Sequence, residues 1–180
     1  MNILWLQIYP FGTLFAYLAA LLEIIMLLVN TTFMMMKSTR TSVNIIEWIA
    51  LRAGMSIYAG WLTAATILNA TIAIQRAGFM EPNLPFGTEQ QWTAFTLWVA
   101  LLVYEAGMIS EKNPIFGAVF VWVLTAIIEE QEGNEVVTLN AQVILGIHIL
   151  SLIGLTGYIV TDTFVYGLPI FENWDRGLFY

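Results

Sequence analysis

Five long apolar runs, separated by short polar links, constrain this 180-residue chain more than any other feature. The runs cover about residues 14–36, 45–74, 92–110, 114–128 and 139–161. A helix that crosses a bilayer needs roughly 20 apolar residues, so five helices and their links use up the chain. The sequence therefore predicts an all-α, polytopic membrane protein. We expect residues 1–180 to form a single integral membrane domain, a bundle of five transmembrane helices.

Composition supports the same class and excludes several functions. Hydrophobic residues make up 59% of the chain and charged residues 11%, whereas soluble domains carry about 25% charged residues. A net charge of −7 argues against nucleic acid as a partner, because binding it requires a basic face. The chain has no cysteine and one histidine, which cannot build a conventional zinc or iron–sulfur site. No acid–base dyad is legible, so we do not expect an enzyme.

Basic residues in the links predict the orientation. Lys37, Arg40, Lys112 and Arg176 fall on one side of the predicted bundle, and Arg76 stands alone on the other. Because lysine and arginine gather on the cytoplasmic or matrix side, we expect the N-terminus outside and the C-terminus inside. The sequence does not name the membrane, and the mitochondrial inner membrane is one candidate.

The second run contains the most informative segment, SIYAGWLTAATILN (56–69). Ser56, Gly60 and Ala64 recur every four residues, and such a seam of small residues lets two helix backbones approach closely. Tyr58 and Asn69 share another face of the same helix. We expect the seam to pack against another helix. The second face either packs against a neighbour or lines a ligand pocket.

This segment resembles the signature helix of long tryptophan-rich relatives of the translocator protein (tryptophan-rich sensory protein) family, through the pattern S-x-Y-x-G-W-x-x-x-A-T-I-x-N. The segment NPIFGAVFVWVLTAI (113–127) is similar to a later Trp-bearing helix of the same relatives. The Trp-x-Pro-Pro type stretch of the translocator proteins proper is not visible. The resemblance implies a five-helix bundle with a cavity for flat apolar ligands, such as tetrapyrroles or sterols. Residue by residue, it assigns Tyr58, Trp61 and Asn69 to that cavity.

Two further tryptophans are candidates for the same cavity. Trp98 and Trp122 lie well inside the third and fourth runs, as Trp61 does in the second. Counted from the inner end of each run, successive tryptophans differ in depth by roughly 6 Å. We expect Trp61 and Asn69 to face the bundle interior, and the three indoles to share one cavity or packing layer.

Several ionisable side chains lie well inside the apolar runs, where such side chains are costly and usually paired. Arg52 and Glu105 fall at similar depth and predict an ion pair between two helices. Glu23, near the middle of the first run, could instead join Arg52. His148, near mid-depth in the fifth run, is either a hydrogen-bonded packing residue or an axial ligand of a haem.

Two functions remain open. The first is a translocator-like membrane protein that binds or senses a small apolar ligand of the tetrapyrrole or sterol class. The second is a non-catalytic accessory subunit of a large membrane complex, such as a respiratory-chain assembly, which the short fourth run, the short links and the aromatic C-terminal tail favour. Neither function requires a cofactor, although a tetrapyrrole is compatible with the first. The expected partners are the lipid bilayer, other membrane subunits or a second copy of the chain, and a small apolar ligand.

Overall fold

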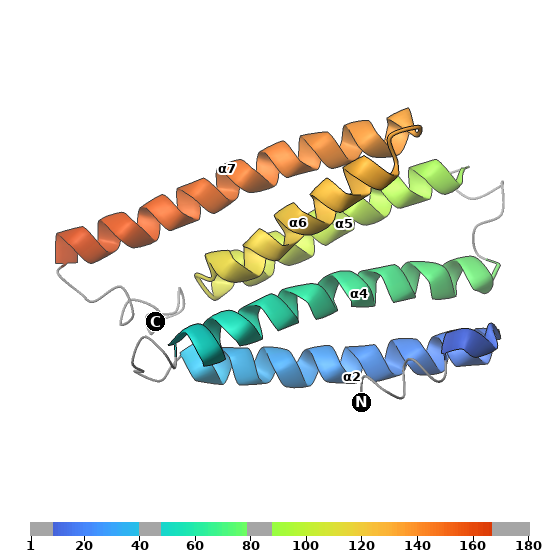
Figure 1. Cartoon of the computed structure of the whole chain (residues 1–180), viewed down its shortest axis with the longest axis horizontal. Helices are drawn as coiled ribbons and strands as arrows, with labels where there is room; N and C mark the ends of the chain where they lie inside the picture. Colours follow the sequence, from blue (N-terminus) through green and yellow to red (C-terminus); the bar gives the residue numbers. More distant parts are fainter. Residues whose placement is uncertain (1–8, 40–47, 79–87, 167–180) are drawn as a thin grey trace.

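The computed structural model describes residues 9–39, 48–78 and 88–166, and its described part is entirely helical (Figure 1). A single 3-10 turn, η1 (Tyr9–Phe11), precedes α2 (Leu14–Thr39). A π-helical segment, η2 (Trp48–Ala53), runs directly into α4 (Gly54–Arg76). The remaining helices are α5 (Glu89–Ser110), α6 (Pro114–Glu130) and α7 (Glu135–Tyr166). The prediction of an all-α chain with five long helical segments is confirmed for these residues, and the predicted helix ends at 45–47 lie outside them.

Local capping signals explain where α5 and α6 begin. Thr88 accepts a hydrogen bond from the backbone N–H of Gln91 at 3.2 Å, which caps α5. Asn113 accepts one from the N–H of Phe116 at 3.1 Å, and Pro114 takes the first position of α6. Both arrangements satisfy backbone donors that a helix start leaves open. The short turn between Ser110 and Asn113 makes α5 and α6 an antiparallel hairpin.

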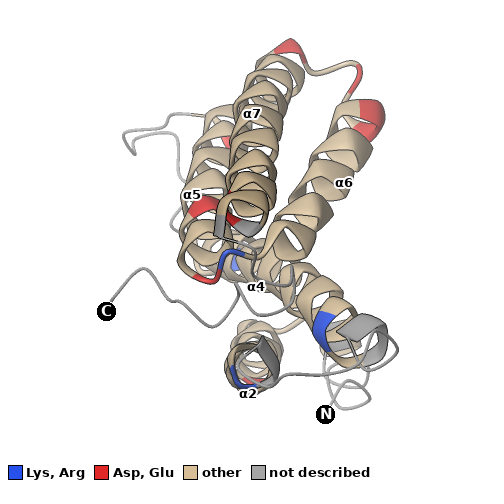
Figure 2. Ribbon diagram, turned by 90° about the vertical axis from the view of Figure 1, so that its left-hand side faces the viewer, with Lys and Arg blue, Asp and Glu red and all other residues tan. Residues whose placement is uncertain are grey.

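The five helices alternate in direction and form two groups. α2 and α4 lie side by side as one antiparallel pair, and α5, α6 and α7 pack together as the second group (Figures 1 and 2). α4 joins the groups mainly through its contacts with α6. The main hydrophobic core lies where these groups meet and includes Tyr104, Phe120 and Leu124.

Charged residues divide between the two ends of the bundle. The last turn of α2, with Lys37, and the α5–α6 turn, with Lys112, lie at the same end (Figure 1). The acidic residues around the α6–α7 turn lie at the opposite end, where Figure 2 shows them in red. Arg40 and Arg176, which the orientation prediction also used, lie outside the described residues.

Four of the five helical segments are long and apolar enough to cross a membrane. These candidate spans are Leu14–Lys37, Leu51–Arg76, Glu89–Ser110 and Glu135–Asp162. α6 has only 17 residues, about 25 Å at ~1.5 Å per residue, which is less than the ~30 Å hydrocarbon core. Five helices are confirmed, whereas length and composition support four of them as spans. Many large apolar side chains face outward, among them Leu102, Leu150 and Phe164, as expected beside acyl chains.

Candidate functional site

A cavity of about 980 Å³ lies between α2, α4, α5 and α6. This volume is at the upper end of the roughly 300–1,000 Å³ of small-molecule sites. Most of the lining is aliphatic or aromatic, and a few polar side chains enter from α2, α4, α5 and α6. The cavity is lined by four of the five residues predicted from the sequence, namely Tyr58, Trp61, Asn69 and Trp122.

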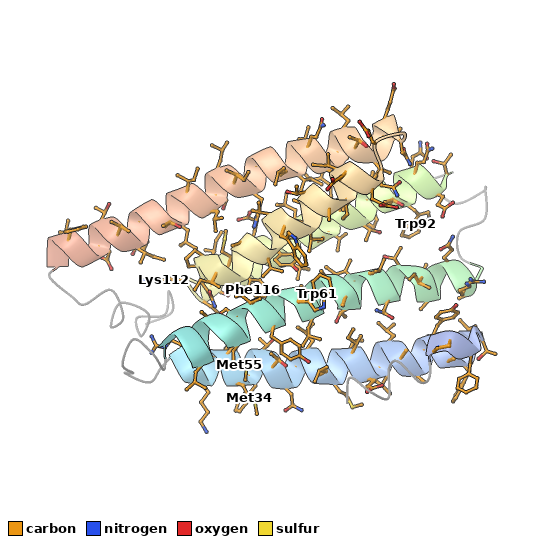
Figure 3. The ribbon with its side chains drawn as sticks, viewed as in Figure 1. Met34, Met55, Trp61, Trp92, Lys112 and Phe116 are labelled. Atoms are coloured by element: carbon orange, nitrogen blue, oxygen red, sulfur yellow. The ribbon has the colours of Figure 1, made fainter. Side chains whose placement is uncertain are left out.

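The small-residue seam of α4 fixes one edge of the cavity. A side-chain carbon at Gly60 would lie 2.9 Å from two carbons of Val119 and 3.1 Å from the carbonyl oxygen of Phe116. Figure 3 shows Phe116 near the start of α6, in the space between α6 and α4. Tyr104 of α5 donates its hydroxyl hydrogen to the carbonyl oxygen of Gly60 at 2.5 Å. The prediction that this seam packs against another helix is confirmed, and the partner is α6.

A buried amide ties the same end of the seam together. The Asn113 side chain is completely buried and donates to the Ser56 hydroxyl at 2.7 Å, while it caps α6. Ser56 in turn donates to the carbonyl oxygen of Arg52 at 2.6 Å. An Asn–Pro pair is a typical helix start, but sequence reasoning missed the contact of Asn113 with α4. The signal was available, because a cap leaves the amide N–H₂ free to donate and Ser56 offered a small polar position on a packing seam.

Two indoles meet across the cavity wall. The ring centroids of Trp61 on α4 and Trp122 on α6 are 5.3 Å apart, with planes inclined by 39°. Trp61 is 47% exposed and Trp122 63% exposed. These rings therefore stand at the open side of the cavity, not in the closed interior that the sequence predicted. An exposed indole pair at the edge of an apolar cavity can contact a flat ring over a large area.

Asn69 and Tyr58 complete the α4 wall. Asn69 is 5% exposed, and its amide donates to the carbonyl oxygen of Ala65 at 2.7 Å. The expectation that Asn69 faces the interior therefore agrees with its burial. Tyr58 is half-buried, so its ring is partly accessible from the cavity that it lines.

Trp98 does not belong to this cavity. Its indole N–H donates to the side-chain oxygen of Asn140 on α7 at 2.9 Å, and Trp98 is absent from the described lining. The neighbouring residues Leu97 and Ala100 do line the cavity. Adjacent helical positions differ by about 100° in direction, so the indole of Trp98 reaches α7 while Leu97 faces the cavity. The predicted layer of three indoles is thus a pair, Trp61 and Trp122.

Glu105 has different partners from the one that depth suggested. One carboxylate oxygen lies 2.7 Å from Nδ1 of His148, and the other accepts from the Ser151 hydroxyl at 2.5 Å. Both partners are on α7, and no described contact joins Glu105 to Arg52, which is 2% exposed in η2. The predicted pair of Glu105 and Arg52 is replaced by contacts with α7, which packs against α5 and binds this carboxylate through His148 and Ser151.

His148 has no ring nitrogen left for a haem iron. Its Nε2 lies 2.9 Å from the carbonyl oxygen of Gly117, and Nδ1 is held by Glu105. A carbonyl oxygen can only accept, so Nε2 carries a hydrogen. The structure supports a packing role for His148. It does not support the haem-ligand role, because neither ring nitrogen is free to bind iron.

Glu23 and Arg52 lie far apart. α2 and α4 run antiparallel, with Arg76 over the Tyr17 ring at 5.5 Å near one end. This register sets Glu23 about level with Asn69, and Arg52 roughly 20–25 Å further along the axis. The two cannot pair as the sequence allowed, and Glu23 instead borders the cavity.

Tyr104 is the main residue that sequence reasoning missed. Its ring stacks on Phe120 with centroids 4.3 Å apart and planes inclined by 8°, and it closes the inner wall of the cavity. The signal was available, because Leu97, Leu101, Tyr104 and Met108 recur at helical spacing. They form one buried face of α5, in which Tyr104 has apolar neighbours before and after it.

The comparisons with known proteins agree with this architecture. No curated protein and no solved structure matches the chain. The sequence model of the family described as TSPO-like protein matches residues 1–155, which include α2, α4, α5, α6 and most of α7. With its long apolar helices, this match identifies an integral membrane protein. The resemblance inferred from the second and fourth apolar runs is confirmed, and the chain belongs to the TSPO-like protein family.

Proposed function

We propose that this protein binds or senses a flat, apolar small molecule of the tetrapyrrole or sterol class in the cavity between α2, α4, α5 and α6. The observation that carries the proposal is the 980 Å³ cavity, bordered by the contacting indoles of Trp61 and Trp122. Aliphatic walls remove ligand surface from water or lipid headgroups, while a few polar groups set its orientation. The family match supports a translocator-like role.

The chemistry of the cavity supports binding and not catalysis. The Glu105–His148–Ser151 cluster is directed into the α5–α7 contact, away from the described lining of the cavity. Because both His148 nitrogens are engaged, a tetrapyrrole in this cavity would be held by stacking and shape. Nothing in the family match or the described contacts favours the alternative of an accessory subunit in a respiratory assembly.

The proposed topology has the end with Lys37 and Lys112 on the cytoplasmic or matrix side. In this topology α6 spans the membrane together with the other four helices, as the second helix of the α5–α6 hairpin. Its short length is accommodated by a thinner bilayer at its end or by a partner, such as another membrane subunit or a second copy of the chain.

Three matched tryptophan variants test the binding site. We expect Trp61→Phe and Trp122→Phe each to weaken binding, because each removes the larger indole surface and part of the ring contact. An aromatic contact contributes about 0.5–1.5 kcal/mol beyond area burial, which corresponds to roughly a twofold to tenfold change in Kd. Trp98→Phe is the control, because it removes an indole of similar exposure on the α7 side.

The measurement uses protein in lipid nanodiscs and ligands that report their own binding. An octaalkylporphyrin and a fluorescent polyene sterol represent the two ligand classes and carry no acidic group. Absorbance or ligand fluorescence, corrected with empty nanodiscs, gives Kd without relying on the mutated indoles. Equal Kd values for all three variants and the wild type would contradict the proposal that this cavity is the binding site. Failure of both probes to bind would contradict it as well.

A further inference from the structure

One buried carboxyl group beside the cavity has no hydrogen-bond partner among the residues that the structure describes. Glu23 of α2 is 7% exposed, and neither of its side-chain oxygens has a hydrogen-bond partner within the described residues. The same residue borders the cavity between α2, α4, α5 and α6. A buried carboxyl group without a partner is costly, and such groups in native proteins call for an explanation. A ligand in this cavity would be the missing partner.

Glu23 also lies at a depth in the membrane where a carboxyl group without a partner is especially costly. It lies nine residues after the start of the Leu14–Lys37 candidate span, or about 14 Å along the helix, close to the middle of a ~30 Å hydrocarbon core. Ionisable residues at this depth are rare and usually serve a functional site. Arg76 is the basic residue nearest along the α2–α4 pair, and it lies over the Tyr17 ring, about 9 Å away along the axis.

The charges around the cavity all have one sign. Among the described residues that line it, Glu23 and Glu130 are acidic and none is basic. Glu130 is exposed at the end of α6, where water and salt screen its charge. Glu23 is buried beside apolar side chains such as Ile24 and Leu27, where screening is weak. Glu23 is therefore the one buried acidic residue among the described residues that line the cavity.

We propose that Glu23 is the recognition group for a protonated amine, so that the ligand is a flat apolar molecule that carries an ammonium group. This inference rests on the proposed function and narrows its ligand class. The ammonium group donates hydrogen bonds to the two free oxygens of Glu23 and neutralises the buried charge. The apolar body of the ligand then lies along the aliphatic wall toward Trp61 and Trp122. A ligand with a carboxylate meets a like charge and no cation, so acidic tetrapyrroles are excluded.

A matched set of three ligands tests the inference. One fluorescent sterol nucleus is prepared with an amine, a hydroxyl or a carboxylate at the same ring position. Each form is titrated into nanodiscs that hold the wild-type protein, Glu23→Gln or Glu130→Gln. Subtraction of the signal from empty nanodiscs removes differences in lipid partitioning. Glutamine keeps the size of the glutamate side chain and removes the buried charge, so Glu23→Gln should fold.

We expect the wild type to bind the amine at least about tenfold more tightly than the hydroxyl form, because hydrogen bonds between charged groups are stronger than neutral ones. The carboxylate form should bind most weakly. Glu23→Gln should bring the amine and hydroxyl affinities to within about twofold and improve binding of the carboxylate. Glu130→Gln should retain the wild-type order, because its carboxylate is exposed and screened.

The other outcomes separate the amine assignment, the role of Glu23 and the proposed binding function. If the wild type binds the hydroxyl form as tightly as the amine, the amine assignment fails while the proposed binding function stands. If Glu23→Gln keeps the amine preference, or Glu130→Gln loses it equally, Glu23 is not the recognition group. If none of the three forms binds the wild type while the octaalkylporphyrin does, the amine-bearing class is wrong for this cavity. If no probe binds, the proposed function fails together with this inference.

Discussion

Replacing Gly60 with alanine tests the contact on which the cavity depends. The added carbon would lie 2.9 Å from Cβ and Cγ2 of Val119 and 3.1 Å from a backbone oxygen. Cβ of Val119 and the backbone oxygen cannot rotate away, so α4 and α6 must separate by several tenths of an ångström. Overpacking of this kind costs typically about 1–3 kcal/mol. Separation would also stretch the 2.5 Å hydrogen bond from Tyr104 to the Gly60 carbonyl oxygen.

A second glycine isolates this packing cost. Alanine is favoured over glycine inside a helix by about 0.5–1 kcal/mol, and that gain applies to Gly60→Ala as well. Gly146 lies inside α7, and a side-chain carbon there would meet nothing within 4 Å. Gly146→Ala should therefore show the gain without the clash. The difference in unfolding free energy between the two variants should equal the packing cost, about 1–3 kcal/mol.

Reversible unfolding in mixed micelles of increasing SDS content, followed by circular dichroism, measures both variants on the same scale. The porphyrin affinity of Gly60→Ala, measured in nanodiscs, should fall at the same time, because α4 and α6 carry the two indoles of the cavity. Equal stability of Gly60→Ala and Gly146→Ala would contradict the close contact between α4 and α6.

Two further predictions concern the buried pair and the orientation. In a double-mutant cycle, Glu105→Leu and His148→Leu should be coupled by at least about 1 kcal/mol, because each single variant leaves a buried or part-buried polar side chain without this partner. Additive unfolding free energies from the SDS titration would contradict the pairing. Because the natural chain has no cysteine, Lys37→Cys and Glu132→Cys give clean reporters of the two ends. An impermeant maleimide should label Lys37→Cys only from the cytoplasmic or matrix side and Glu132→Cys only from the other. Labelling of both from one side would refute the topology.

Within a single helix, the sequence predicted most of what the structure contains. The apolar runs located the five helices, because a long apolar segment is buried in lipid or protein and satisfies its backbone hydrogen bonds there as a helix. The spacing of Ser56 and Gly60 identified the packing seam, and the apolar run that begins at residue 114 located the start of α6. Each of these features depends on residues that are neighbours along one helix, so periodicity and capping rules are sufficient to find them.

Relations between helices were less predictable, because depth along a helix says nothing about direction around it. The sequence predicted a similar depth for Arg52 and Glu105, but Glu105 faces α7 and bonds to His148. Trp98 was predicted to share a layer with Trp122, but its indole is turned toward Asn140. Which helix pairs with which, and at what rotation, follows from the packing of many side chains together. The sequence could therefore name four residues of the cavity wall but not the partners of Glu105.

The exposed position of the Trp61–Trp122 pair determines which ligand concentration controls the occupancy of the cavity. These indoles lie at the side of the bundle, and other exposed side chains of α4 in its middle turns, such as Ile57 and Leu68, are apolar. A molecule that enters beside them comes from among the acyl chains and not directly from water. Its occupancy then follows its mole fraction in the bilayer, so doubling the lipid at constant total ligand halves the effective dose. Affinities for this protein are comparable only when the ratio of ligand to lipid is fixed.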